Sequence, residues 1–309
     1  MKNKFNNINF MATLKPVSIA YAALIIIGII LTVIFGANLD INFKGGTRIS
    51  YSYQGDIDTA AVTAKVNEVL GKQATVSTSS DISGNTKQLI ISLVGNSSLS
   101  ADVQENLNKT LTDTYPDNKF ALYDSNSVSP TIAGTFFAKS LVAVVLAGIG
   151  VVIYVGIRFR KIGGVSAALM AYVALVLDCI VAFLTCTIFR LPVDSNLIAV
   201  ILTLLGYSLN DTIVIYDRIR ENKTLYPGKE LKELVNESVN SVKVRTFVTT
   251  LSTVIAIIVI IIVSEIFGLS TLRSFAIPMA FGLISGCVSS LFISAPLWVL
   301  YKTRNKKSK

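Results

Sequence analysis

Residues 17–36 read VSIAYAALIIIGIILTVIFG, an apolar run without a charged side chain. A helix of about 20 such residues is long enough to cross the roughly 30 Å of hydrocarbon in a bilayer. The run is too long for the apolar part of a typical signal peptide, and Phe35-Gly36-Ala37-Asn38 at its end matches a cleavage site poorly. We therefore predict an uncleaved signal anchor as the first membrane span.

Five further apolar runs follow along the 309-residue chain. Hydrophobic residues make up 52% of the composition and charged residues only 15%, whereas a soluble domain carries about 25% charge. The mean hydropathy of +0.61 points the same way. This composition excludes a soluble enzyme, a fibrous protein and a disordered chain, and it predicts a polytopic α-helical membrane protein with six transmembrane helices. The five runs are 138–157, 164–188, 196–216, 247–263 and 275–301.

Basic residues are distributed as the positive-inside rule expects, with Lys and Arg enriched in cytoplasmic loops. If the N-terminus is cytoplasmic, the two short outer loops hold only Arg190 and Arg273, and every basic cluster falls inside. The sequence thus predicts both termini in the cytoplasm. The net charge of +9 then reflects topology rather than nucleic-acid binding. The clusters lie at 2–15, 158–161, 218–245 and 302–309.

The polar stretch between the first two spans alternates between strand and helix patterns. In TRISYSY (47–53) every second residue faces one side, which is typical of a strand, and Ser100 and Asp56 or Asp58 are candidate helix N-caps. The predicted order is βαββαβ, the ferredoxin-like order, which makes an α+β extracytoplasmic domain. The predicted strands are 47–53, 74–78, 88–94 and 120–123, the helices are 57–70 and 100–114, and a turn is expected at 83–85.

The chain is expected to divide at the membrane surfaces. Lys44-Gly45-Gly46-Thr47 lacks the upstream glycine and the preceding strand of a phosphate-binding loop, so it predicts a tight turn into the first strand of the outer domain. The expected parts are 1–37 with the cytoplasmic N-terminus and first helix, 38–137 with the extracytoplasmic domain, 138–301 with the other five helices, and 302–309 as a basic tail.

Composition also disfavours several kinds of chemistry. Histidine is absent, which removes histidine-dependent nucleophile pairs, HExxH zinc sites and histidine proton shuttles. Cys179, Cys186 and Cys287 lie in apolar runs at spacings that match no zinc site, and we interpret them as small hydrophobic residues. We expect no metal and no cofactor.

Three ionisable residues fall inside predicted spans, where each costs about 2.5–3.5 kcal/mol on insertion scales. Asp178 lies in the third span, Asp211 in the inner part of the fourth, and Arg245 at the start of the fifth. Each can be a static buried pair, and Arg245 can also be an ordinary basic residue at a cytoplasmic helix end. These structural interpretations fit Asp211 least well of the three residues. Its carboxylate side chain is too short to extend far toward the membrane surface.

Helical spacing gathers polar residues into stripes on the fourth and fifth spans. If these helices face each other, Asp211 gains hydroxyl and guanidinium neighbours. Burial favours the protonated acid and an approaching cation favours the ionised one, which is the minimum equipment for a proton-driven conformational cycle. The stripes are Tyr207, Ser208, Asp211, Ile215 and Arg218; Asn210 and Asp217; Arg245, Thr249 and Ser252; and Thr246, Thr250 and Thr253.

Small residues mark the last span as a helix that packs closely. Gly282, Gly286 and Ser290 recur at intervals of four, which permits close helix contact. Packing inside this chain is the favoured interpretation, and a docking face for a partner membrane protein is the alternative. Pro278 and Pro296 can kink this span.

The stretch GYSLNDT (206–212), followed by YDRIREN (216–222), resembles the signature of the SecF subunits in the SecD/SecF family of protein-export membrane proteins. FKGGT (43–47) and the pair Arg245-Thr246 resemble two further motifs of that family. The resemblance covers nearly the whole chain. Two departures lie away from the candidate site: Asn42 stands where the family often has aspartate, and 129–131 (SPT) where it often has a glycine–proline pair.

The resemblance implies half of a twelve-helix transporter of the resistance–nodulation–division type, placed in the bacterial cytoplasmic (inner) membrane. It implies a non-enzymatic accessory subunit that works with SecD at the SecYEG translocon and its auxiliary membrane subunits. Such a subunit uses the proton motive force to promote export of preproteins. The resemblance further implies proton-coupling roles for Asp211 and Arg245, a helper role for Asp178, and supporting roles for Asn210, Tyr207, Thr249, Asp217 and Arg218.

Three alternatives remain open. Half of a small-molecule or lipid exporter of the same superfamily would need apolar or aromatic pocket residues in the outer domain, which is instead rich in Ser, Thr and Asn. An intramembrane aspartyl protease would pair Asp178 with Asp211 as a dyad, but Leu209 and Asn210 stand where that class has Gly-x-Gly before the aspartate. A structural scaffold would hold the charges as static pairs.

Overall fold

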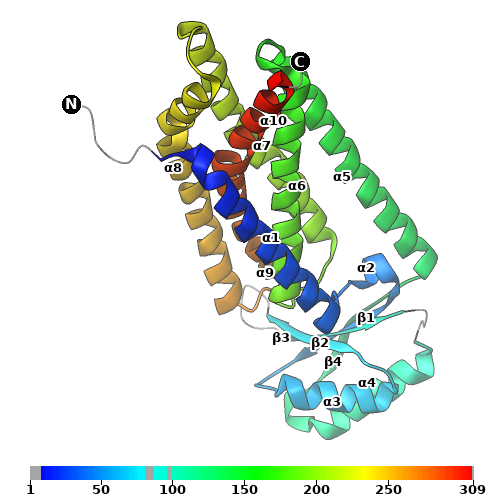
Figure 1. The fold of residues 1–309 in the computed structure, drawn as a ribbon. Helices are drawn as coiled ribbons and strands as arrows, with labels where there is room; N and C mark the ends of the chain where they lie inside the picture. Colours follow the sequence, from blue (N-terminus) through cyan, green and yellow to red (C-terminus); the bar gives the residue numbers. More distant parts are fainter. Residues whose placement is uncertain (1–7, 81–86, 96–98, 308–309) are drawn as a thin grey trace.

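The computed structural model describes the chain except for residues 1–7, 81–86, 96–98 and 308–309. A bundle of long helices adjoins a smaller sheet-and-helix domain (Figure 1). Within the described residues, six helical segments are long and apolar enough to cross a membrane, which confirms the predicted number of spans. They are α1 (Phe10–Phe35), α5 (Pro130–Arg158), α6 (Gly164–Ile188), α7 (Ser195–Leu225), α8 (Leu231–Ile266) and a last segment made of α9 (Ser270–Ser289), the π-helical turn η3 (Ser290–Ser294) and α10 (Ala295–Lys307).

Most of the membrane helices extend beyond their apolar runs. Helix α5 begins at Pro130, eight residues before the run, because the Ser129 hydroxyl accepts from the Ile132 N–H and proline tolerates the first turn, where its missing N–H is not needed. Helices α7 and α8 continue into polar sequence at the opposite end of the bundle. The apolar run marks only the part of a helix that the bilayer surrounds.

The outer domain lies between α1 and α5 along the chain and contains one antiparallel sheet in the order β2-β3-β1-β4. Its elements follow the order βαββαβ. The last strand is longer than predicted, and the short helix α2 before the sheet was not predicted. The predicted turn at 83–85 lies outside the described residues. The bounds are α2 (Ile41–Lys44), β1 (Gly46–Tyr53), α3 (Thr59–Leu70), β2 (Thr75–Ser80), β3 (Lys87–Val94), α4 (Ala101–Thr114), η1 (Pro116–Asn118) and β4 (Ala121–Val128).

The sheet separates the domain helices from the bundle (Figure 1). The alternation in β1 buries Ile49, Tyr51 and Tyr53 against α3 and α4, as the pattern predicts. Asp58 caps α3 by accepting from the Ala60 N–H at 2.9 Å, so of the two candidate caps it is Asp58 that serves. The opposite face of the sheet therefore points toward the membrane with its polar side chains, Arg48 among them.

The chain between α1 and β1 joins the outer domain to the bundle. Leu39 forms a parallel bridge with Val193 in the loop between α6 and α7. Phe43 of α2 packs on Phe136 and Phe137 of α5, with ring centroids 5.7 and 5.5 Å apart. Gly45 has a φ of 77°, and a Cβ built there would lie 2.8 Å from Cα of Pro130. The predicted tight turn at Lys44–Thr47 is thus also a close contact with the start of α5.

Helix α9 packs closely on α7 through its small residues. A Cβ on Gly282 would overlap Leu204, a Cβ on Gly286 would meet Ser208 at 3.1 Å, and Ser290 hydrogen-bonds Thr212 at 3.0 Å. The interpretation as packing within the chain is confirmed. The π-helical turn at Ser290–Ser294 ends two residues before Pro296, whose missing N–H removes a regular helical bond there.

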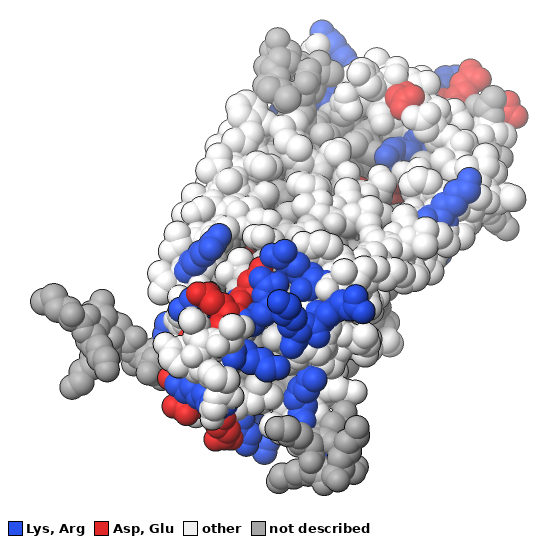
Figure 2. All heavy atoms as spheres, turned by 90° about the horizontal axis from the view of Figure 1, so that it is seen from above, with Lys and Arg blue, Asp and Glu red and all other residues white. Residues whose placement is uncertain are grey.

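Lys and Arg side chains gather at the end of the bundle away from the outer domain, as Figure 2 shows from above. Cys186 and Cys287 are buried in the apolar cores of the bundle, as expected for small hydrophobic residues.

We expect Gly45→Ala to lower the unfolding midpoint of the purified protein in detergent more than Gly36→Ala. Both glycines have φ near 75° and extended ψ, so alanine brings a backbone strain of about 1–3 kcal/mol at either site. Only at Gly45 does the new methyl group also overlap Pro130. Equal midpoints for the two variants would show that this contact does not hold the domain to α5.

Candidate functional site

Asp211 lies on α7 inside the bundle and is 3% exposed. Its Oδ2 accepts one hydrogen bond, from the Thr250 hydroxyl of α8 at 3.3 Å. Thr250 belongs to one of the two polar stripes expected on the fifth span. A buried carboxylate that accepts several hydrogen bonds is stabilised in its charged form, and a single long bond from a neutral hydroxyl does little of this.

Arg245 opens the polar stripe of α8 but does not meet Asp211. Its side chain is exposed on the bundle surface, and among the described residues no ion pair joins it to the carboxylate. The expected hydroxyl neighbour of Asp211 is present, and the expected guanidinium neighbour is not. Thr249, one turn further along α8, is exposed on the same stripe.

Tyr207 ties α7 to α8 one turn before Asp211. Its hydroxyl donates to the Thr249 carbonyl at 3.1 Å and hydrogen-bonds the Thr253 hydroxyl at 2.7 Å. Near the basic end of the same seam, the Arg218 Nε donates to the Ser241 hydroxyl at 3.1 Å. Asp217 pairs with Arg158 of α5 at 3.0 Å. These three residues of the signature therefore hold α7 against its neighbours.

Asp178 on α6 is fully buried and accepts three serine hydroxyls. Ser208 of α7 donates at 2.7 Å, and Ser285 and Ser289 of α9 donate at 2.7 and 3.0 Å. The Tyr21 hydroxyl of α1 in turn hydrogen-bonds Ser285 at 3.0 Å. We call these five residues the Asp178 cluster. It joins four of the membrane helices through one carboxylate.

Sequence reasoning found Asp178 and Ser208 but missed Ser285, Ser289 and Tyr21. The signal for the two serines was present, because they stand four apart beside the small residues of the last span. A buried aspartate needs donors, and serines at helical spacing on a close-packed helix can supply them. Tyr21 carried no comparable signal in its apolar run.

The two membrane carboxylates have separate partners. Asp178 is surrounded by the serines of its cluster, Asp211 bonds Thr250, and no described hydrogen bond or shared partner links them. An aspartyl protease dyad requires two carboxylates close enough to share a proton. The geometry therefore gives the protease alternative no support.

A polar strip of α7 is exposed at the depth of the membrane. Asn210 is exposed one residue before Asp211, and Thr203 and Gly206 are exposed on the same stripe. Polar side chains that face hydrocarbon are costly, and in membrane proteins they normally face protein or water. The strip continues beside the exposed part of the α8 stripe, to which Tyr207 connects it.

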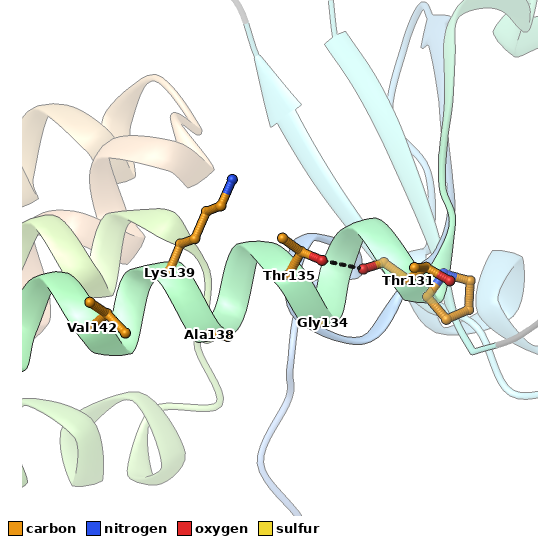
Figure 3. A pocket seen from close by; sticks show the side chains of 7 residues that line it. Thr131, Gly134, Thr135, Ala138, Lys139 and Val142 are labelled. Carbon is orange, nitrogen blue, oxygen red and sulfur yellow. Dashed lines mark hydrogen bonds between the residues drawn. The ribbon is translucent and has the colours of Figure 1, made fainter.

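Three hollows among the described residues bear on the small-molecule exporter alternative, which needs an apolar pocket in the outer domain. One shallow hollow of about 570 Å³ runs along α5 alone, past Thr131, Thr135 and Lys139, and the Lys139 side chain points away from the helix (Figure 3). A second, of about 520 Å³ and apolar, lies near the basic end of the bundle between α8 and α9. The cavity that the outer domain lines has a mixed surface, with Ser and Thr as well as apolar residues in its lining.

Several known proteins similar to this chain are named as protein-export components. The family described as protein export membrane protein SecD/SecF, C-terminal, matches residues 106–304. The protein translocase subunit SecF of Calditerrivibrio nitroreducens is 33% identical over 98% of this chain and 96% of its own length. SecDF of Bacillus subtilis is 34% identical over 98% of this chain, which spans only 39% of that longer protein.

A solved structure extends the similarity to three dimensions. The crystal structure of SecDF from Thermus thermophilus, described as a translocon-associated membrane protein, superimposes with a TM-score of 0.79 at 27% identity. The match covers 98% of this chain and 40% of that one.

The Asp178 cluster predicts different outcomes for two substitutions. Asp178→Leu leaves hydroxyls of three serines without their acceptor, at about 1–3 kcal/mol for each group left unpaired, and should clearly lower the unfolding midpoint in detergent. Asp178→Asn keeps the shape and can hydrogen-bond rotated hydroxyls, so its midpoint should stay close to that of the natural protein. A leucine variant as stable as the asparagine variant would contradict a structural role for the cluster.

Proposed function

Because this chain belongs to the SecD/SecF family of protein-export membrane proteins, we propose that it is a translocase accessory subunit that uses the proton motive force. In this proposal it works with SecD, in the bacterial inner membrane, to promote the movement of preproteins through the SecYEG translocon. The role is mechanical and not enzymatic. The observation that carries the proposal is Asp211, a carboxylate buried in a membrane helix with one hydroxyl partner at 3.3 Å.

Asp211 is suited to exchange a proton because neither of its charge states is fixed by its surroundings. Asp178 accepts three hydrogen bonds and is sealed, whereas Asp211 accepts one and is held at the seam between α7 and α8. A carboxylate with few partners is favoured as the neutral acid when buried and as the anion when a cation comes near. Proton uptake and release can then follow a movement of the seam.

Arg245 supplies that cation in a second arrangement of the helices. Its side chain is exposed on α8 in the present arrangement, five positions before the residue that bonds Asp211. A rotation or shift of α8 that carries the guanidinium toward α7 would stabilise the ionised Asp211 and release its proton. Tyr207, which bonds Thr249 and Thr253, would have to exchange partners in the same movement.

The driving force is large enough for such a switch. A membrane potential of about 180 mV supplies about 4 kcal/mol for each proton that crosses it. That energy shifts a two-state equilibrium about a thousandfold.

The polar strip of α7 supports a partnership with SecD. Asn210 and its exposed neighbours would face lipid in the isolated chain, and a second set of membrane helices would cover them. The relatives named SecDF are long enough to contain such a second set, since this chain spans about two-fifths of their length. We propose that the strip is the contact with SecD.

The same proposal includes the orientation of the chain in the membrane and the location of the outer domain. The basic end of the bundle is the cytoplasmic end, which places both termini in the cytoplasm and residues 38–137 outside. The outer domain is assigned to the ferredoxin-like class on its βαββαβ order and its β2-β3-β1-β4 antiparallel sheet.

We expect Asp211→Asn to remove only the gradient-dependent part of preprotein export from membrane vesicles. Asparagine keeps the size and hydrogen bonding of the side chain but cannot exchange a proton. Export is measured with and without a proton gradient, and Asp211→Glu, which keeps an exchangeable proton, should retain part of the stimulation. Asp102→Asn, on the exposed surface of α4, is the matched control and should behave as the natural protein.

Gradient-stimulated export by the asparagine variant at the natural level would contradict the proposal. Asp211 would then be a tolerated buried polar group, and the scaffold interpretation would take its place.

We expect Asn210→Cys to form disulfide cross-links with single cysteines placed in the membrane helices of SecD. The control is Ile153→Cys, on the exposed lipid side of α5. Cross-linking of both positions to the same extent, or of neither, would contradict the proposal that the polar strip of α7 contacts SecD.

A further inference from the structure

A cavity of about 580 Å³, lined by both polar and apolar residues, lies between the outer domain and the outer ends of the membrane helices. Its volume is within the range of about 300–1,000 Å³ that is usual for binding sites. Strands β1, β2 and β3 line it from the domain side. The loops between α6 and α7 and between α8 and α9 line it from the membrane side.

The cavity follows the open edge of the sheet. Thr75, Val76, Ser77 and Thr78, four consecutive residues of β2, all line it. Successive residues of a strand point to opposite faces, so a lining that includes all four indicates a space that reaches the strand edge. From β3, by contrast, it touches Ile90 and Ser92, which share the face toward the membrane.

This edge of β2 has no strand partner among the described residues. Strand β2 is the outermost strand and pairs only with β3. Its outward backbone N–H and C=O groups are therefore available for pairing, as on any sheet edge. The four cavity-lining residues extend over about 13 Å of strand.

The lining offers hydrogen bonds without a strong net charge. Hydroxyls of Ser and Thr line both sides, and a hydroxyl can either donate or accept. The charged groups are largely paired, Arg48 with Asp40 and Arg273 with Glu265 at 3.0 Å. Burial also raises the pKa of the Asp194 carboxyl above its usual range. Such a lining does not select a charged small molecule.

We propose that this cavity holds an extended segment of the exported polypeptide, paired through its backbone with the open edge of β2 as an added strand. The inference rests on the proposed function in protein export. Strand addition gains its affinity from main-chain hydrogen bonds, which every sequence can make. A subunit that assists many different preproteins needs that tolerance. The adaptable hydroxyls around the edge then accept varied side chains.

The test uses the full chain with SecD and the translocon in membranes, and a preprotein stalled by a tightly folded C-terminal domain. Single cysteines are placed at consecutive positions of the stalled segment, and Ser77→Cys is placed in the cavity. We expect disulfide cross-links that alternate, present at one position and lost at the next, because side chains of a paired strand alternate between faces. Thr112→Cys, exposed on α4 away from the sheet, is the matched control and should give no cross-links.

A second pair of variants tests whether the preprotein segment occupies the cavity beside β2 or only lies near the outer domain. Ser92→Trp places an indole in the cavity, leaves the sequence of β2 unchanged and should abolish the cross-links to Ser77→Cys. Ser125→Trp, on the opposite edge strand β4, should leave them unchanged. Assembly of each variant with SecD is checked by its continued cross-linking through Asn210→Cys.

Cross-links without alternation, equal cross-linking of Thr112→Cys, or cross-links of Ser77→Cys to SecD instead of the preprotein would each overturn the inference. These outcomes are independent of proton coupling, since the stalled segment is trapped without a gradient. Absent cross-links together with a normal loss in Asp211→Asn would reject this site and leave the proposed function intact.

Discussion

A carboxylate buried among membrane helices must find its hydrogen bonds within the protein, and Asp178 shows how far this constraint shapes the bundle. Its partners come from α7 and α9, and Tyr21 extends the cluster to α1. Serines that donate to one carboxylate must stand close together, so α9 can carry only small residues where it meets α7. Gly282 and Gly286 satisfy this condition next to Leu204 and Ser208. The hydrogen bonds of the Asp178 cluster and the close packing of α9 on α7 therefore depend on each other.

Helix α7 has two unlike sides as a result. Ser208 binds it to the sealed Asp178 cluster, while Tyr207 and Asp211 attach it to α8 by a few hydroxyl contacts. A helix fixed on one side and lightly bonded on the other has a preferred place to move, namely the seam with α8. This asymmetry also explains why two buried aspartates of the same bundle would serve different roles. One is satisfied and structural, and the other is kept poorly satisfied.

Much of this architecture could be predicted from the sequence because membranes make the signal strong. Apolar runs of fixed length revealed six spans, and period-two and helical patterns revealed the outer domain around Ile49 and Tyr51. Helical spacing grouped Thr250 into one of two polar stripes on α8 that could face Asp211. It could not show which of the two α8 stripes faces inward, since both carry hydroxyls at the same intervals. Arg245 was expected beside Asp211 and lies exposed. The rotation of α8 about its axis is set by the packing of residues such as Val254 and Ile257. Similar apolar residues occur on every face of this helix, so the sequence does not reveal which face is buried.

The bridge between Leu39 and Val193 has a mechanical consequence. Val193 stands two residues before the first turn of α7, and Asp211 lies about 24 Å further along that helix. A helix transmits an axial displacement with little loss, because its backbone hydrogen bonds run along the axis. Helix α7 and the bridge between Leu39 and Val193 thus connect Asp211 mechanically to the segment that leads into the outer sheet. Phe43 of the same segment packs on α5. An axial movement of α7 relative to α5 would therefore tilt the sheet about the contact between Phe43 and α5.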